Sequence, residues 1–486
     1  MDSEKKKILI LVLALILGGL TLIVAPGTGL DIYGQRLLAT LIVMVVIWVG
    51  GALSYPVSAF LLIVLMTFAV ADYSQAGGMK SAFKLALKGF SGTVPITVIA
   101  GTALAAVVKS SGLAKRIVYV IMKKLATNAK TANASKILAA FFLVDIPTSM
   151  MVPTAMGRCA TYMSIAEGLQ DPFKFAKVTD KDNPPNPFQK AVWITVALAP
   201  IIMGTAFLTG AEATIMVGGL IEDFTGIPQL WGSSFALLFL PALLLLFVSW
   251  LILTRLFPTT VNDIPINFIN DELIKLGKMT YQEKYTLVTL LATIFMFVTD
   301  SIHHIHPAIV LLASTVILFL PRIGPGNWKR DSKEIAWGGF VVIGVAYGYA
   351  SLLREFGVID YFVRLLQTFN VTGYFGVLAI MIILTVIVRV GIASITSAAT
   401  ILVPIALALG AASGLTPEHT VGVGWVTYVF CRLAIFFPHQ GGQLIMVYDK
   451  DYFTRNDLKK AGAVITLAAL AIYSLWSGIF MPIILS

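Results

Sequence analysis

Long runs of apolar residues, separated by short polar connections, recur along the whole chain. A helix that spans a bilayer must present about 20 mostly apolar residues to lipid, and the runs have this length. The pattern therefore predicts an all-α polytopic membrane protein. The expected helices lie near residues 8–25, 36–52, 56–72, 93–109, 188–208, 233–256, 285–300, 306–321, 338–352, 373–388, 420–437 and 461–484.

Two apolar stretches contain residues that would break a simple transmembrane helix. Residues 137–165 contain Pro147 near their middle, and residues 373–412 contain Arg389. Irregular backbone at membrane depth survives only where it is buried in protein or lines a cavity. Both stretches are therefore predicted to form re-entrant hairpins with polar tips, and the first tip is expected at residues 145–149.

The two hairpins fall in two halves of the chain that repeat one another. Residues 148–153 align with residues 399–404, and both segments end in Val-Pro. Lysines flank the first hairpin but not the second, so the halves are predicted to have opposite orientations. Paired, interrupted segments in inverted halves indicate a midplane substrate site in a transporter. The expected divisions are an N-terminal segment with the first span at 1–34, a first inverted repeat at 35–257, a cytoplasmic linker at 258–284 and a second inverted repeat at 285–486.

Charged residues are scarce, and their positions orient the chain. They make up 12% of the sequence, against about 25% in a soluble domain, and the net charge is +10. Lysines cluster at the N-terminus and in loops 113–136 and 168–190. The positive-inside rule places the N-terminus in the cytoplasm and the C-terminus outside, which requires an odd number of full spans, about 11. The expected location is the plasma membrane of a prokaryote. Because the basic residues flank apolar spans, the bilayer is the expected partner and nucleic acid is not.

Several motifs resemble those of the divalent anion/sodium symporter (DASS) family of dicarboxylate transporters, and the resemblance covers nearly the whole chain. Residues 111–116 are similar to the family's segment before the first hairpin, and residues 276–284 to its mid-chain linker. The family's hairpin tips read Ser-Asn-Thr. Residues 394–396, Ser-Ile-Thr, keep the serine and the threonine, whereas the ungapped slots of the first hairpin fall on residues 143–145, Leu-Val-Asp.

Two further turns carry the resemblance. Residues 210–214, Gly-Ala-Glu-Ala-Thr, stand where the family has Gly-Thr-Pro-Pro-Asn. Residues 439–443, His-Gln-Gly-Gly-Gln, are similar to the last turn of the family's exchangers. The resemblance implies a homodimer formed through a scaffold of outer spans, and a transport unit that contains both hairpins and moves by an elevator-type mechanism.

The resemblance also implies that the hairpin tips bind the carboxylates of the substrate. Half-helix N-termini offer unpaired N–H groups and a partial positive charge, and hydroxyl groups add donors. Small hydroxyl residues also allow helices to pack closely, which is the structural alternative. The candidate substrate-binding residues are Pro147, Thr148, Ser149, Ser394, Thr396, Ser397, Gly441, Gly442 and Gln443.

Polar residues inside the apolar stretches form a second group of candidates. A charge at mid-helix costs at least about 2.5 kcal/mol on insertion scales, so each should face a cavity or a partner. Snorkelling, ion pairing and capping are the structural alternatives. Arg432 is one of these intramembrane charges. The candidates for charge compensation or coupling are Asp145, Arg158, Glu212, Thr214, Arg389 and His439.

The missing asparagines bear on the coupling ion, because the family's sodium ions lie behind the hairpin tips. Without these side chains, a fixed arginine or histidine is expected to supply the positive charge that sodium provides to a dianion. Asp145 and Glu212 would then pair with an arginine or take a proton. No cofactor is expected, and Na+ is the only ion that the resemblance suggests.

The histidines at 303, 304 and 306 are interpreted as a solvated loop, since nothing is spaced to complete a zinc site.

These features predict a secondary active transporter of small di- or tricarboxylates such as malate, succinate or 2-oxoglutarate, working as a sodium-independent exchanger. The alternative is a sodium-coupled symporter of dicarboxylate, citrate or sulfate. An anion channel is a weaker reading, because broken inverted repeats suit a gated midplane site better than a continuous pore. An intramembrane enzyme is disfavoured, because the chain has no His-Glu-x-x-His motif and Gly391-Ile-Ala-Ser394 lacks the context of a serine nucleophile.

Overall fold

The computed structural model describes residues 3–72, 78–126, 131–132, 134–152, 154–258, 264–265, 267–369 and 371–485. Nearly all regular structure in these ranges is helical, and the strands β1 (Thr131–Ala132) and β2 (Ile264–Pro265) form one short antiparallel pair. Seven of the described helices are long and apolar enough to cross a membrane, or up to eight if a bent pair counts as one span. The predicted all-α polytopic architecture is confirmed, and the figure of about 11 spans stays a prediction.

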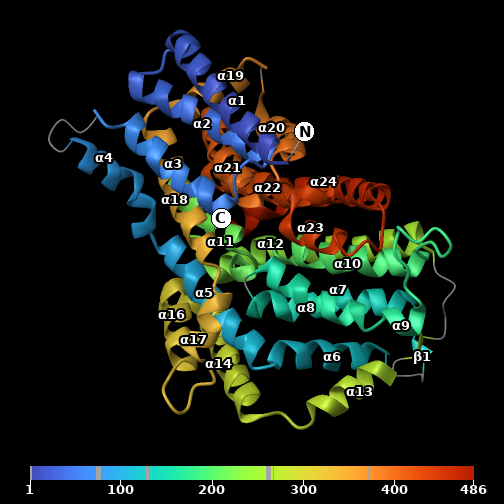
Figure 1. Ribbon diagram of the computed structural model, residues 1–486. Helices are drawn as coiled ribbons and strands as arrows, with labels where there is room; N and C mark the ends of the chain where they lie inside the picture. The colour runs from blue at the N-terminus through green and yellow to red at the C-terminus, as the bar shows by residue number, and fades with distance from the viewer. Residues whose placement is uncertain are drawn as a thin grey trace.

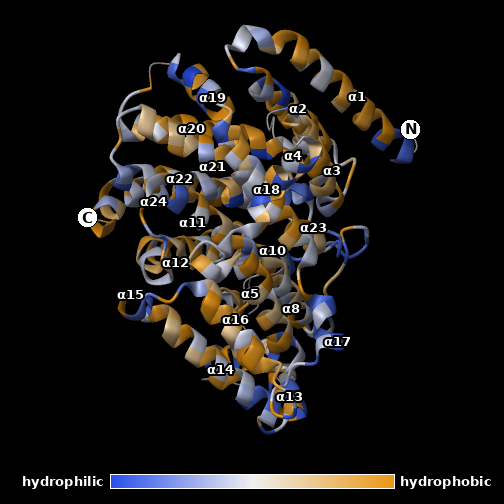
Figure 2. Cartoon of the chain, turned by 90° about the vertical axis from the view of Figure 1, so that its left-hand side faces the viewer, coloured by the Kyte–Doolittle hydropathy of each residue, from blue (hydrophilic) through white to orange (hydrophobic). Residues whose placement is uncertain are grey.

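The N-terminal helices form a layer at one edge of the molecule (Figure 1). Helix α1 (Ser3–Val24) packs along α2 (Ile32–Gly50), which contacts α3 (Tyr55–Ala69). The turn before α2 is closed by Asp31, whose carboxylate accepts the Gly34 N–H at 2.6 Å. Many apolar side chains of α1 are exposed, and Figure 2 shows apolar residues along this helix and along α14 and α16. Such surfaces suit contact with lipid.

An amphipathic segment follows, and it ends in a tight backbone contact. It consists of α4 (Gly78–Ala86) and η2 (Lys88–Ser91). Ala82 and Ala86 are buried, whereas the lysines at 80, 84 and 88 are exposed. The lysines therefore lie on the exposed side of this segment, as suits a helix in the membrane interface. A Cβ at Gly89 would collide with the backbone of residues 344 and 348, so only glycine allows this approach.

The first half of the chain continues with α5 (Thr93–Ser110) and α6 (Leu113–Ala126). The first hairpin consists of α7 (Ala134–Met151) and α8 (Ala155–Glu167), and the short α9 (Gln170–Phe173) follows it. A broken helix comes next, formed by α10 (Pro187–Met203), η3 (Leu208–Gly210) and α11 (Glu212–Thr225). The half ends with the long α12 (Trp231–Leu256), and α13 (Asn267–Leu276) lies in the predicted linker.

The tip of the first hairpin is a correction to the sequence analysis. Helix α7 continues through Pro147 to residue 151, so the expected tip at residues 145–149 is wrong, and the turn lies between α7 and α8. Two hydroxyl groups donate to backbone carbonyls near the proline: Thr148 to Val144 at 2.9 Å, and Ser149 to Ile146 at 2.8 Å. Neighbouring hydroxyls are one reason that membrane helices tolerate proline. The aligned Pro153 lies outside the described residues.

The second half contains α14 (Tyr281–Val298), α15 (Asp300–His303), α16 (Pro307–Leu318), α17 (Trp328–Asp331) and η4 (Ser332–Glu334). Helices α18 (Trp337–Glu355) and α19 (Val358–Gln367) precede the second hairpin, which is formed by α20 (Gly373–Gly391) and α21 (Ile395–Ala412). The last elements are α22 (Pro417–Leu433), η5 (Pro438–Gln440), α23 (Gly442–Tyr448) and α24 (Arg455–Leu485).

One order of elements occurs in both halves. A helical hairpin precedes a helix that is interrupted by a 3-10 turn, and a long helix follows: α7, α8, α10, η3, α11 and α12, then α20, α21, α22, η5, α23 and α24. The two long final helices pack against each other, and α11 packs against both α21 and α22. The boundaries of the repeats and their inverted orientation stay predictions.

Helix α18 lies between two groups of helices and positions the site. On one side it contacts α3, α5 and η2, and on the other side it contacts α11 and α21. The seam between α18 and α21 therefore joins the N-terminal layer to the second hairpin (Figure 1). Cavities lie along this seam.

Candidate functional site

A cavity of about 370 Å³ opens at the N-terminal end of α18, where the two hairpin turns approach the two 3-10 turns. Pocket volumes of this size are typical of small-molecule sites. The residues that line it are Tyr55, Pro56, Thr154, Ala155, Met156, Ala211, Glu212, Ala213, Gly338, Gly339, Val342, Ala393, Ser394, Ile395, Thr396, Arg432, His439, Gly441, Gly442, Gln443 and Ile445.

Four of the helices that begin at this cavity follow the hairpin turns and the 3-10 turns. Helices α8, α11 and α21 are 13, 14 and 18 residues long, and the seven-residue α23 is the fourth. Thr154 accepts the Gly157 N–H at 3.2 Å, and Ser394 accepts the Ser397 N–H at 3.1 Å. The other first-turn N–H groups have no intrahelical partner, and each helix end carries a partial positive charge. The convergence creates a site that attracts anions.

Seven of the residues predicted from sequence line this cavity. They come from the second hairpin tip, from the start of α11 and from the last turn: Ser394, Thr396, Glu212, His439, Gly441, Gly442 and Gln443. Their roles as ligands or coupling groups stay predictions. The sequence analysis missed the opposite wall, which is formed by Thr154 of the first hairpin and by Tyr55, Gly338 and Gly339 of α3 and α18.

Arg432 supplies a fixed positive charge at the wall of the cavity. It is 3% exposed, and its guanidinium donates to the carbonyls of Ile201 at 3.1 Å and Pro200 at 3.2 Å. The hydroxyl of Tyr428 accepts a third bond at 3.3 Å. No described carboxylate lies within ion-pair distance of Arg432. The sequence showed this residue as an intramembrane charge, which was the signal available for it.

Arg158 and Asp145 form a buried ion pair behind the first hairpin turn. The Nε of Arg158 lies 2.9 Å from the Asp145 carboxylate, and both side chains are at most 1% exposed. The Tyr162 hydroxyl donates to the same carboxylate oxygen at 2.7 Å. Arg158 also donates to the carbonyls of Val152 at 2.6 Å and Gly210 at 2.9 Å. The pair therefore ties the hairpin turn to the 3-10 turn before α11, and neither residue lines the cavity.

Arg389 makes the equivalent connection in the second half. Its guanidinium donates to the carbonyls of Ile392 and Ala393 in the turn between α20 and α21, and to the carbonyl of Gln440 in η5. The Gln440 amide donates back to the Arg389 carbonyl at 2.7 Å. Arg389 is fully buried, and no described carboxylate lies within ion-pair distance. Each hairpin turn is thus joined to a 3-10 turn by one arginine.

The remaining candidates lie outside the cavity. Thr148 hydrogen-bonds Tyr162 within the Asp145 network, and Ser149 and Pro147 are part of α7. Thr214 donates to the Gly204 carbonyl at 2.7 Å and contacts Tyr428. Ser397 is buried one turn into α21, where it lines a small space of about 10 Å³ further along the α18–α21 seam. These positions support the helix ends, and their contact with substrate stays a prediction.

The three loop histidines are not gathered around a common point. His303 accepts the Ile305 N–H at 2.9 Å, and His306 accepts the Ala308 N–H at 3.1 Å to begin α16. Among the residues that the structure describes, no group of three or more His, Cys, Asp or Glu side chains is placed to hold a metal ion.

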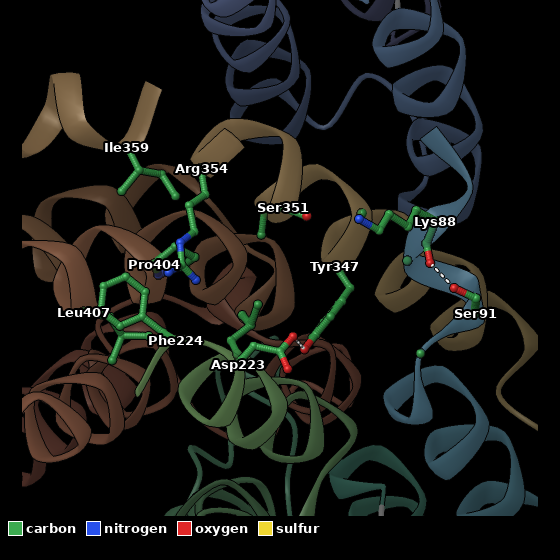
Figure 3. A pocket seen from close by; sticks show the side chains of 15 residues that line it. Lys88, Ser91, Asp223, Phe224, Tyr347, Ser351, Arg354, Ile359, Pro404 and Leu407 are labelled. Atoms are coloured by element: carbon green, nitrogen blue, oxygen red, sulfur yellow. Dashed lines mark hydrogen bonds between the residues drawn. The ribbon is translucent and has the colours of Figure 1, made fainter. Parts of the chain in front are cut away.

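A second cavity, of about 310 Å³, lies at the other end of α18. Figure 3 shows two contacts between α18 and α11 at this cavity: the Tyr347 hydroxyl donates to the Asp223 carboxylate, and Arg354 lies beside Phe224. The Arg354 guanidinium is 4.5 Å from the centroid of the Phe224 ring. Between the two cavities, Val345 and Ala346 of α18 are buried. The seam is therefore open to small molecules at both ends and closed in the middle.

Comparison with known proteins finds a matching family model and several relatives. The family model described as the sodium:sulfate symporter transmembrane region matches residues 5–486. A membrane protein of Cupriavidus necator is 26% identical over 93% of this chain and 88% of its own length. The sodium-dependent dicarboxylate transporter SdcS of Staphylococcus saprophyticus is 23% identical over 66% of this chain and 64% of its own. The putative malate transporter YflS of Bacillus subtilis is 21% identical over 56% and 55%.

The buried ion pair yields a stability prediction. We expect Arg158→Gln to lower the free energy of unfolding by about 3–5 kcal/mol, because it leaves the Asp145 carboxylate buried without its partner. Thermal unfolding of the detergent-purified protein measures this loss. Lys450→Gln is the control, since Lys450 pairs with Glu167 at 2.6 Å but both side chains are 41% exposed, and it should cost at most about 1 kcal/mol. Equal shifts in the two variants would contradict the assignment.

Proposed function

Because the chain belongs to the sodium:sulfate symporter transmembrane family, we propose that it is a secondary active transporter of small dicarboxylates such as malate, succinate or 2-oxoglutarate. Membership makes it a multi-pass membrane transporter of anions. The observation that carries the substrate class is the cavity where four helices begin beside Arg432. Two positive groups of N-termini, one from each hairpin and its 3-10 turn, suit an anion with two carboxylates.

The relatives support the same substrate class. The Staphylococcus saprophyticus relative is named as a sodium-dependent dicarboxylate transporter, and the Bacillus subtilis relative as a putative malate transporter. We extend the dicarboxylate preference to this chain on the strength of its cavity. Because the Staphylococcus saprophyticus relative is named as sodium-dependent, sodium-coupled symport is the second candidate function.

We propose exchange without sodium as the leading mode. A sodium ion needs oxygen ligands, and the interrupted helices of transporters supply them as unwound carbonyls. Here the carbonyls of Val152 and Ile392 in the hairpin turns already accept hydrogen bonds from Arg158 and Arg389. These guanidinium groups are permanent cations, and they hydrogen-bond the turn carbonyls without a metal ion. This arrangement supports a transporter in which the carbonyls of the hairpin turns are hydrogen-bonded without sodium.

We propose that alternating access follows the α18–α21 seam, with the hairpins moving as a unit against α3, α5 and α18. The cavities at the two ends of α18 would be the two access routes. The Tyr347–Asp223 hydrogen bond and the Arg354–Phe224 contact join α18 to α11 at one end of the seam. They would act as a latch that keeps the middle of the seam closed from this end. We also propose that the N-terminus lies in the cytoplasm and that two copies are joined through the scaffold.

The sodium test uses proteoliposomes loaded with succinate. We expect counterflow of labelled malate at the same rate with sodium and with choline as the only cation, because the charge at the hairpin turns is supplied by arginines. Unloaded vesicles are the control for net uptake. Strong stimulation by sodium would favour the symporter instead.

The hairpin-tip test uses two hydroxyl deletions. We expect Ser394→Ala and Thr396→Ala each to weaken succinate binding about tenfold, because a hydrogen bond to a charged group is worth about 1.5–3 kcal/mol. Competition against labelled succinate in exchange assays measures the affinity. Ser164→Ala is the matched control, since Ser164 lies on α8 and bonds only its own helix, at the Ala160 carbonyl. If both tip variants keep the native affinity, the substrate binds elsewhere.

The latch test uses an introduced cysteine. Ala346→Cys places a thiol in the closed middle of the seam, where Ala346 is 7% exposed, and both native cysteines are buried. We expect Tyr347→Phe to speed labelling of this cysteine by a membrane-impermeant maleimide about tenfold, because the bond to the Asp223 carboxylate is lost. Ala346→Cys alone is the reference. Equal labelling rates would mean that the contact does not control access.

A further inference from the structure

Glu212 is an acidic group inside a site built to attract anions. It is the first residue of α11, it lines the cavity, and its side chain is half-buried. Within the described part of the chain, its carboxylate accepts no hydrogen bond and forms no ion pair. One of its oxygens lies 3.2 Å from the position that a Cβ would take at Gly339 of α18. The carboxylate therefore reaches across the seam into the space that substrate would occupy.

The charges around the cavity explain what this carboxylate does to a bound dianion. Arg158 is neutralised by Asp145, whereas Arg389 and Arg432 have no carboxylate partner among the described residues. These two arginines balance a dianion fully when Glu212 is neutral. When Glu212 is ionised, the site holds an additional negative charge next to the substrate, and like charges at short range in a poorly solvated site repel strongly.

We propose that Glu212 binds the proton that accompanies each dianion, so that the carboxyl is neutral in the loaded site and ionised in the empty one. The inference rests on the proposed function, because it assigns the coupling ion of the same site. The proton adds to a carboxylate oxygen as the dianion binds, and it returns to water when the dianion leaves. In the empty site, the N-terminus of α11 favours the ionised form.

Other groups face the same space and must be separated from Glu212 in any pH experiment. Arg432 approaches from α22, Tyr55 from α3 and His439 from η5, whereas α18 presents only glycines and Val342. His439 is exposed; its Nε2 lies 3.1 Å from the Val390 carbonyl, and its ring stacks on Phe437. Because arginine keeps its proton and tyrosine is neutral at ordinary pH, His439 is the competing titratable group.

The test is equilibrium binding of labelled succinate to the purified protein, over an alkaline range in which succinate is fully ionised. Proton and dianion binding are reciprocally linked. We expect the apparent Kd to rise about tenfold per pH unit above the range where Glu212 ionises, with about one proton taken up per succinate, as an indicator dye reports. In Glu212→Gln the Kd should not depend on pH and proton uptake should vanish. Glu212→Asp should restore both, and His439→Gln should keep both.

The outcomes separate this inference from the proposed function. If the native protein binds no dicarboxylate at any pH, the proposed function fails. If it binds succinate with a Kd that does not vary with pH, or if Glu212→Gln keeps the proton uptake, the proton assignment is overturned. Loss of the pH dependence in His439→Gln alone would assign the proton to the histidine. Tighter binding of an amino-dicarboxylate that disappears in Glu212→Gln would show that the carboxylate binds an ammonium group instead.

Discussion

The structure depends on satisfying helix ends that lie inside apolar surroundings. An unpaired polar group in a bilayer costs several kcal/mol because no water replaces the lost hydrogen bond. Arg158 and Arg389 meet this constraint by donating to the carbonyls of the hairpin turns and of the neighbouring 3-10 turns. Because the arginines hydrogen-bond these carbonyls, the N–H groups at the starts of the following helices can face one cavity. The candidate anion site is thus a product of how the breaks are stabilised.

Much of the fold was predictable because the length of an apolar run in the sequence indicates the length of a membrane-spanning helix. The second hairpin was predicted at residues 373–412, and the structure begins α20 at Gly373 and ends α21 at Ala412. The first tip was misplaced because a proline beside a charge looks like a helix break. In the structure the hydroxyls of Thr148 and Ser149 donate to nearby backbone carbonyls. The sequence pattern around Pro147 did not indicate these bonds.

The site was predictable only where its chemistry is local. Ser394, Thr396 and the glycines before α23 were found because hydroxyl residues and glycines interrupt apolar runs. Tyr55, Gly338 and Gly339 were missed, because they contribute by lying on helices that pack against the hairpins from distant parts of the sequence. Arg432 was visible as a costly charge, but its carbonyl partners near Pro200 became known only from tertiary packing.

The glycine contact between η2 and α18 holds these two elements together. Gly89 brings its backbone against residues 344 and 348 so closely that the two elements are locked in register. A joint without side chains to rearrange offers no alternative packing at this point. In the transport cycle proposed above, η2 and α18 would therefore move as one piece, and any sliding would take place on the face of α18 that contacts α11 and α21.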